Sequence, residues 1–397
     1  MGRTMTPQPT APGVQLLRSG GALFASLIEA MQQAQHEVLL ETYIFDFEGA
    51  GGDVARALMA AAQRGVRVQL VVDGVGTGTL PPAWAERMVQ AGVQWRVYSP
   101  LGGLGFWLPS RWRRLHRKLC VVDRHVAFCG GINILDDLID PNVPGGLSQP
   151  RLDYAVRVTG PLVMQMHDTM RQLWSRIEAV RELRSQDIAG ALDALRSVDQ
   201  DLKLSPRGPL TLVLRDNVRH RTQIERAYRK ALAGAHHEVT LASAYFFPGL
   251  RLRRALAMAA RRGVRVRLLL QGQYEYFVPY RASRQLYGQL LAAGVEIYEY
   301  HASVLHAKVA VVDGRWATVG SSNLDPFSLL LAREANVVVR DAAFAQALHN
   351  DLMQAIATGA TRVDPEHFAH RPAWQRVIDW GASAVLRFGV FLTGKRY

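Results

Sequence analysis

The segment HRKLCVVD at residues 116–123 recurs in register as HAKVAVVD at residues 306–313, and this repeat is the strongest indication of the fold. A glycine turn and an asparagine follow each copy, at Asn133 and Asn323, and the His, Lys, Asp and Asn positions are all offset by the same 190 residues. One such match would most simply be a half-exposed strand edge. Two matches in register predict two copies of one domain that share a task.

The repeat extends well upstream of this motif. The segment EVLLETYIFDF begins at Glu37 and its equivalent EVTLASAYFFP begins at Glu238, and each leads into a helix-period stretch, a glycine and an apolar run. This alternation favours the α/β class, with a mixed β-sheet flanked by helices in each half. We predict four segments: a first domain over 14–177, a connector over 178–208, a second domain over 209–356 and an amphipathic C-terminal tail over 357–397.

The spacing within the motif has a chemical meaning. His116 and Lys118 lie two residues apart on a predicted strand, as do His306 and Lys308, so each pair points to one face. An ammonium group suits a phosphate oxygen, and an asparagine amide after a glycine turn can donate to another. Two half-sites that meet face to face would hold a phosphodiester between two histidines, one attacking phosphorus while the other protonates the departing alcohol. Such chemistry needs neither a metal nor another cofactor.

These paired motifs resemble the phospholipase D superfamily, and in particular the bacterial cardiolipin synthases of the type B branch. The resemblance covers residues 14 to 356 and is most specific at AYFFPG (244–249) and WATVGSSNLDP (316–326). It implies two phospholipase D-like domains packed face to face in pseudo-two-fold symmetry, a phosphohistidine intermediate, and phosphatidyl transfer that forms cardiolipin from phosphatidylglycerol. By the same analogy His116 is the nucleophile and His306 the acid and base, although the symmetry of the halves leaves their order open.

A histidine that attacks phosphorus needs a carboxylate partner on its other ring nitrogen. In the resembling family that acid follows the asparagine, which points to Asp153 in the first half and Glu334 in the second. Each could also be an ordinary surface charge. The second copy adds Ser321 as a phosphate ligand beside the asparagines of both motifs, whereas the first copy has Gly131 at the matching position. We therefore expect two unequal half-sites.

Each motif also ends in an aspartate, Asp123 in the first copy and Asp313 in the second. Their position at predicted strand ends, just before turns, favours a structural role over contact with substrate. We nevertheless group them with the motifs to which they belong. The predicted catalytic set is His116, Lys118, Asp123, His306, Lys308 and Asp313.

The composition narrows the choice of partners and of compartment. The chain has 47 Lys and Arg against 34 Asp and Glu, a formal net charge of +13, which favours anionic partners such as nucleic acid or anionic lipid. Cys120 and Cys129 are its only cysteines, too few for a disulfide framework, and they indicate a reducing compartment. A hairpin between them would leave a cross-strand disulfide open.

Membrane contact is expected at the surface of the protein. No window of 18 apolar residues free of charge predicts a membrane span, and the first 13 residues lack a signal-peptide pattern. We therefore expect a peripheral protein on the cytoplasmic face of the cell membrane. The insert LGGLGFWLP (101–109), followed by the basic RWRR (111–114), suits a lipid interface, although it could pack on its own domain. The tail is either a peripheral membrane helix or a helix docked on the core, with apolar residues at near-helical spacing: Trp374, Val377, Ile378, Val385, Phe388 and Leu392.

Other activities of the same superfamily remain open from sequence. A nuclease would suit the charge of +13, but the Trp and Leu residues among the basic residues before His116 favour anionic phospholipid, so we expect no nucleic-acid partner. Phospholipase D-type hydrolysis differs from transfer only in that water replaces the lipid alcohol, which depends on pocket shape and water exclusion. The sequence does not indicate an oligomeric state.

Overall fold

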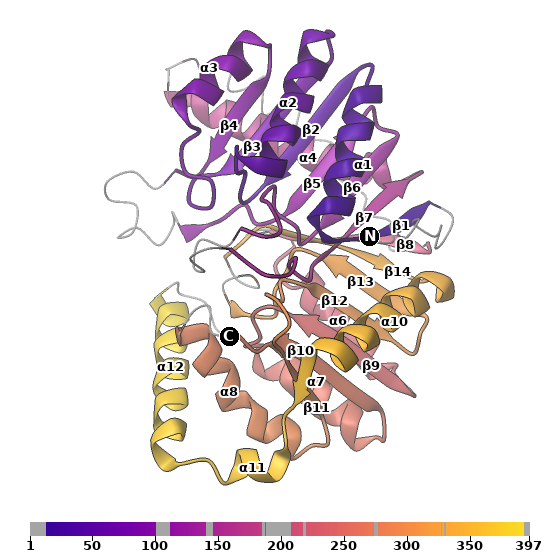
Figure 1. Ribbon diagram of the computed structural model, residues 1–397, viewed down its shortest axis with the longest axis vertical. Helices are drawn as coiled ribbons and strands as arrows, with labels where there is room; N and C mark the ends of the chain where they lie inside the picture. The colour runs from indigo at the N-terminus through magenta and orange to yellow at the C-terminus, as the bar shows by residue number, and fades with distance from the viewer. Residues whose placement is uncertain are drawn as a thin grey trace.

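Two mixed β-sheets, one from each half of the chain, form the centre of the computed structural model (Figure 1). The structure describes residues 13–100, 112–139, 146–184, 187, 208–216, 220–273, 277–326, 328 and 331–392. The first half contains β1 (Val14–Arg18), α1 (Ser19–Gln33), β2 (Glu37–Thr42), α2 (Gly49–Gln63), β3 (Arg67–Asp73), α3 (Pro82–Gln90), β4 (Gln94–Tyr98), β5 (Lys118–Val122), β6 (Val126–Gly130), β7 (Tyr154–Thr159) and α4 (Leu162–Arg184). The second half contains β8 (Leu210–Arg215), α6 (Gln223–Ala233), β9 (Glu238–Ser243), α7 (Leu250–Arg261), β10 (Arg265–Gln271), α8 (Phe277–Leu291), β11 (Glu296–Tyr300), β12 (Lys308–Val312), β13 (Trp316–Gly320), β14 (Glu334–Val339), α10 (Ala342–Gly359), β15 (Ala360–Arg362), α11 (Pro365–Ala369) and α12 (Ala373–Leu392).

The strand order shows that the two halves are copies of one design. The first sheet runs β1-β7-β6-β5-β2-β3-β4, and the second runs β8-β14-β13-β12-β9-β10-β11 with β15 added at its edge. In each copy three strands are parallel, and the motif strand, β5 or β12, lies antiparallel to the first of them. The predicted α/β class with two mixed sheets is confirmed. The predicted boundary at residue 177 lies within α4, and that at residue 356 lies within α10.

The sheets meet through their apolar faces. Leu119 and Val121 of β5 belong to the same buried core as Val309 of β12 and Val337 of β14. The opposite face of the first sheet is covered by α1 and α2, and that of the second by α6 and α7, so the central strands are buried on both sides. This explains why the motif strands read as continuous apolar runs instead of alternating patterns. It also sets the two motifs opposite one another, as the predicted face-to-face arrangement requires.

The two cysteines lie on opposite faces of the first sheet. In the register of β5 with β6, Cys120 is opposite Phe128 and Cys129 is opposite Leu119. Cys120 packs in the core under α1 and α2, whereas Cys129 packs in the core between the halves. Because side chains one position apart in register point to opposite faces, these thiols cannot form the cross-strand disulfide that the sequence left open. Both act as small buried apolar residues.

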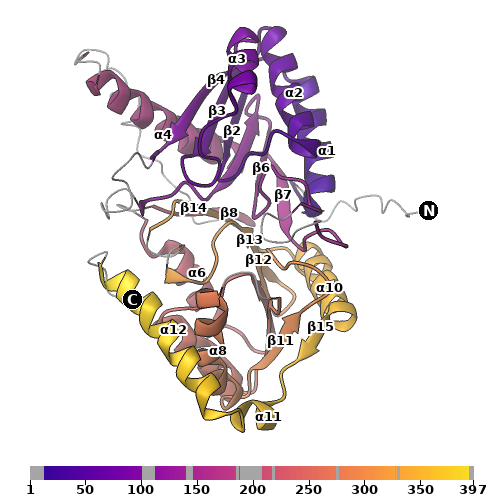
Figure 2. The same ribbon diagram turned by 60° about the vertical axis from the view of Figure 1, so that its left-hand side comes forward.

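The C-terminal helices lie against the second half. Figures 1 and 2 both show α12 running alongside α8 at the outer side of the molecule. Ala382 and Leu386 of α12 pack on Ala282 and Leu286 of α8. The buried carboxylate of Asp379 pairs with Arg281 of α8 and with Arg371, at N–O distances of 3.4 and 2.9 Å.

Candidate active site

Main-chain contacts between the halves bring each histidine beside the acid of the other half. The amide of His116 donates to the carbonyl of Arg333, and the amide of Arg333 donates to Arg114, at 3.0 and 2.8 Å. In the symmetric contact, the amide of His306 donates to the carbonyl of Leu152 at 2.9 Å. Arg333 directly precedes Glu334 and Leu152 directly precedes Asp153. These main-chain contacts therefore place Glu334 of the second half beside His116 of the first, and Asp153 of the first half beside His306 of the second.

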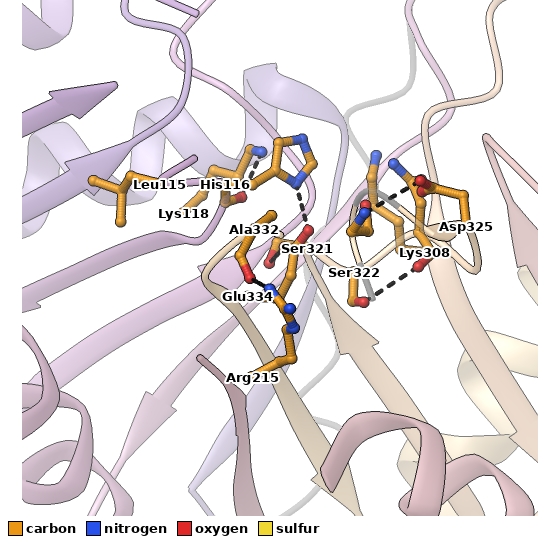
Figure 3. A network of polar contacts seen from close by, with 12 residues as sticks. Leu115, His116, Lys118, Arg215, Lys308, Ser321, Ser322, Asp325, Ala332 and Glu334 are labelled. Atoms are coloured by element: carbon orange, nitrogen blue, oxygen red, sulfur yellow. Dashed lines mark hydrogen bonds and ion pairs between the residues drawn. The ribbon is translucent and has the colours of Figure 1, made fainter. Parts of the chain in front are cut away.

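Each histidine is held at Nδ1 by a carboxylate from the opposite half. The distance from His116 Nδ1 to Glu334 Oε1 is 2.9 Å, and that from His306 Nδ1 to Asp153 Oδ2 is 2.6 Å (Figure 3 shows the first pair). A carboxylate at Nδ1 keeps the proton there and leaves the Nε2 lone pair for the substrate. Both acids are buried, so the suggestion that they might be surface charges is wrong.

Burial favours the neutral form of both rings. Burial lowers the pKa of His116, and burial together with the Lys308 cation lowers the pKa of His306 to about 3. Burial alone would raise the pKa of Asp153, but the charge of Lys308 and the hydrogen bond with His306 hold it below its usual value. The resting site therefore holds two neutral imidazoles at neutral pH, each with a nucleophilic nitrogen.

Each motif lysine contacts the main chain of the histidine two residues before it. Lys118 Nζ donates to the carbonyl of His116 at 2.7 Å, and Lys308 Nζ donates to the carbonyl of His306. Lys308 Nζ also lies 3.7 Å from Asp153 Oδ2. Burial, reinforced by the charge of Lys308, lowers the pKa of Lys118 to about 7. An anionic phosphate between the halves would restore the charge of this group.

Ser321 does not face the cavity, contrary to its predicted role as a phosphate ligand. Its hydroxyl donates to Glu334 and it is fully buried. At the matching Gly131, a Cβ atom would lie only 2.4 Å from Asp153 Oδ1, so the shorter acid occupies the space that the serine fills in the second half. The half-sites are unequal as expected, but the difference lies in how each acid is held.

Both histidines line one cavity of about 590 Å³ between the halves, together with Asn133 and Asn323. The Asn133 amide oxygen accepts from the Ile44 amide at 3.2 Å, which leaves its NH₂ group to donate to a ligand. Asn323 is 3% exposed, and its amide oxygen has no partner among the residues that the structure describes. Both asparagines therefore line the same cavity as the two histidines.

The rest of the cavity wall is mainly apolar and aromatic. It includes Tyr245, Phe246, Phe247, Leu331 and Leu386 from the second half. Trp112 and Arg114 from the basic end of the insert also line it, whereas residues 101–111 lie outside the described part of the chain. A few convergent polar groups in an apolar cavity are typical of a site for an amphipathic ligand.

Known proteins of similar sequence show the family to which this chain belongs. The family described as "Cardiolipin synthase, PLD-like domain" matches twice, at residues 27–143 and 228–356. The chain belongs to this family. Cardiolipin synthase B of Escherichia coli (strain K12) is 38% identical, over 91% of this chain and 84% of the relative. A cardiolipin synthase of Geobacillus kaustophilus is 30% identical, over 94% of this chain and 72% of the relative. The predicted cardiolipin synthase-like phosphatidyltransferase of the phospholipase D superfamily is thereby confirmed.

Solved structures show that the fold is shared more widely. A phosphatidylserine synthase from Haemophilus influenzae Rd KW20 has a TM-score of 0.68 and covers 96% of this chain and 94% of its own, at 12% identity. A polyphosphate kinase from Porphyromonas gingivalis has a TM-score of 0.56 and covers 98% of this chain and 57% of its own, at 13% identity. At such low identity these two likenesses concern the fold alone.

Within the described ranges, no group of three or more His, Cys, Asp or Glu side chains could hold a metal ion. None of the helices in those ranges is both long and apolar enough to cross a bilayer.

Tyr43 and Arg215 are two candidate functional residues that the sequence pattern did not predict. The centre of the Tyr43 ring lies 4.9 Å from that of the His116 ring, and Lys118 Nζ lies 5.4 Å from the centre of the same tyrosine ring. Tyr43 therefore packs against one side of His116, the candidate nucleophile. Arg215 of β8 is 2% exposed, donates to the carbonyl of Ala332 and lies opposite Glu334 in the strand register. A charged residue at the end of an apolar strand was the only signal for Arg215.

Asp123 and Asp313 are structural, which corrects their inclusion in the catalytic set. The Asp123 carboxylate accepts from the amides of residues 35–37 at 2.7 to 2.8 Å, and Asp313 does the same for residues 236–238 at 2.8 to 2.9 Å. Each fixes the turn that leads into the first parallel strand. Seven residues of extended chain, roughly 20 Å, separate each aspartate from the histidine of its motif.

We expect Asp313→Ala to lower the free energy of unfolding by about 2–3 kcal/mol, because three amides lose a charged acceptor. The kcat of the folded protein should stay unchanged. Chemical denaturation and steady-state assays on the same preparation would measure both quantities. A large fall in kcat without a loss of stability would contradict the structural role.

The lowered pKa of Lys118 predicts an alkaline limb in the pH profile. Because the pKa is about 7, Lys118 loses its charge in the free enzyme as the pH rises through 7. The value of kcat/KM, which reports the free enzyme, should therefore fall more steeply above about pH 7 than below it, by up to roughly one further power of ten per unit. Lys118→Arg keeps its charge at all these pH values and should remove this added steepness, even if its maximal rate is lower. The same limb in the variant would show that another group titrates.

Proposed function

We propose that this enzyme transfers a phosphatidyl group from one phosphatidylglycerol to the hydroxyl of a second one, forming cardiolipin and releasing glycerol through a phosphohistidine intermediate. The observation that carries the proposal is the pair of histidines in one cavity, each held at Nδ1 by a carboxylate of the opposite half. Because both Nδ1 atoms are held by carboxylates, both Nε2 atoms are left to act on a phosphorus bound in that cavity. The names of the relatives add support for the lipid product.

In the first step, His116 Nε2 attacks phosphorus and the bond from phosphorus to the glycerol oxygen breaks. The departing oxygen takes a proton from His306. In the second step, the hydroxyl of the acceptor lipid gives its proton to His306 and attacks phosphorus, and the bond from phosphorus to His116 breaks. His306 thus begins and ends the cycle protonated, and no further reactant is consumed.

The electrostatics of the site fit this sequence of proton transfers. In the free enzyme burial and the nearby lysines disfavour a charged imidazole, and the pKa of His306 is lowered to about 3. An anionic phosphodiester between the lysines would offset their charge, so His306 could take up its proton as the substrate binds. The lysines and asparagines would then stabilise the charge that develops on the phosphoryl oxygens.

Two further properties belong to this proposal. We expect the acyl chains of both lipids to lie along the apolar cavity wall, which excludes water and favours transfer over hydrolysis. We also expect the enzyme to act as a peripheral protein on the cytoplasmic face of the cell membrane. Two buried free cysteines are compatible with a reducing compartment.

The direct test incubates the purified protein with phosphatidylglycerol vesicles in the presence of a chelator. Equal amounts of cardiolipin and free glycerol are the expected products. Phosphatidic acid in place of cardiolipin would indicate a hydrolase. If plasmid DNA is cleaved under these conditions while phosphatidylglycerol stays intact, the enzyme is a nuclease and the proposal fails.

A further inference from the structure

Helix α12 has two apolar faces, of which only the inner one is covered by residues that the structure describes. Its inner face packs on α8 through Ala382 and Leu386. On the other side, four aromatic side chains are largely exposed: Trp374, Trp380, Phe388 and Phe391, at 58%, 63%, 61% and 75%. Val377 and Val385 lie between them and are also exposed. We call these six residues the outer stripe of α12.

The spacing of the outer stripe places it on one side of the helix. Its members recur at intervals of three residues, with one interval of five between Trp380 and Val385, along the 20 residues of α12, about 30 Å of helix. The other positions on that side, Gly381 and Ala384, are small and uncharged. Single exposed apolar residues are common on protein surfaces, but a continuous aromatic stripe of this length indicates a binding surface.

We propose that the outer stripe of α12 is the surface by which this enzyme docks on an anionic lipid bilayer, with the helix lying flat in the interface. Trp and Phe on one side of a helix, with cations along its edge, suit the boundary between headgroups and acyl chains. Arg376 and Arg387 are exposed on this helix, and the chain carries a formal charge of +13. An anionic surface attracts that charge, whereas a second copy of the chain repels it.

The position of α12 links docking to the catalytic cavity. Leu386, on the inner face of the helix, is part of the cavity wall that also includes both histidines. One helix therefore contacts the substrate cavity on one side and offers the outer stripe on the other. A bilayer at the outer stripe would lie next to the cavity, so a lipid could enter with its acyl chains along α12. This part of the inference rests on the proposed function.

Docking can be measured independently of catalysis with a fluorophore on α12. Phe388→Cys places a thiol in the outer stripe, and Val89→Cys places one at a similarly exposed position (63%) on α3 as a matched control. The native thiols should not react, because both are buried and burial raises the pKa of Cys129 to about 12. An environment-sensitive label at 388 should shift to the blue on vesicles of 30% phosphatidylglycerol in phosphatidylcholine, and a label at 89 should not. Equal responses at both positions, or none at 388, would overturn the docking surface.

A second variant tests what docking does. Changing the four aromatic residues of the outer stripe to serine should weaken binding to the same vesicles by about 100-fold or more in a flotation assay. Activity on vesicles should fall in parallel, while activity on monomeric short-chain phosphatidylglycerol should persist, because the cavity is untouched. Thermal unfolding would check that the variant folds, and if it does not, the label experiment decides alone.

The remaining outcomes separate the two proposals. If the wild-type protein docks through α12 but makes no cardiolipin, the proposed function fails and the docking surface stands. If the serine variant binds vesicles as well as the wild type does, the docking surface fails, whatever the activity. If the serine substitutions convert a dimer to a monomer in light scattering and leave vesicle binding unchanged, the outer stripe joins two copies of the chain and the docking surface fails.

Discussion

His116→Ala and His306→Ala should each lower the rate of cardiolipin formation by about 10⁴-fold or more, because each removes a group that makes or breaks a bond at phosphorus. His36, which is exposed and has no part in the cavity, provides the matched control, and His36→Ala should retain full activity. Product analysis by mass spectrometry at matched enzyme concentrations would measure these rates. Wild-type activity in either cavity variant would remove the proposed site.

The two histidine variants should also differ from each other. A donor with a p-nitrophenyl leaving group needs no proton to depart, so His306→Ala should still release one p-nitrophenolate per enzyme in a rapid burst as it forms the covalent intermediate. His116→Ala should give no burst, because it lacks the proposed nucleophile. The reverse result would exchange the roles of the two histidines while leaving the pair intact.

Asp153→Asn and Glu334→Gln should each lower kcat by about 10²–10⁴-fold, because the amide neither fixes the ring tautomer nor stabilises an imidazolium. The structure adds a sharper expectation, since each acid holds the histidine of the opposite half. In the burst assay Asp153→Asn should behave like His306→Ala, and Glu334→Gln like His116→Ala.

The control for this prediction is Asp123→Asn, an aspartate of the motif itself that fixes a turn far from the cavity. Its kcat should be unchanged, while its stability falls. If Asp153→Asn instead resembled the loss of His116, the acids would act within their own halves. The crossed pairing in the structure would then not be the one used in catalysis.

Much of the site could be predicted from the residues, because the chain repeats. An offset of 190 residues shared by His, Lys and Asn is strong evidence for a common task, and both histidines and both asparagines do line one cavity. Ser321 and the two motif aspartates show the limit of this reasoning. A motif gives residue types and spacing along a strand, but which polar atoms face the cavity depends on neighbours from other strands. The hydroxyl of Ser321 donates its hydrogen bond to Glu334, and Asp123 and Asp313 accept hydrogen bonds from main-chain amides.

The α/β class, the doubling of the domain and the histidine and lysine pairs follow from the order of the amino acids, because strand periodicity and a repeated motif are local properties of the chain. The crossing of the acids between the halves follows instead from tertiary contacts, which join the main chain of Leu152 and Arg333 to the segments that lead to the histidines. Only the structure could also show that α12 is both a docked helix and an exposed one. The pairs Asp153–His306 and His116–Glu334 depend on how the two sheets pack, and a local sequence pattern does not contain that information.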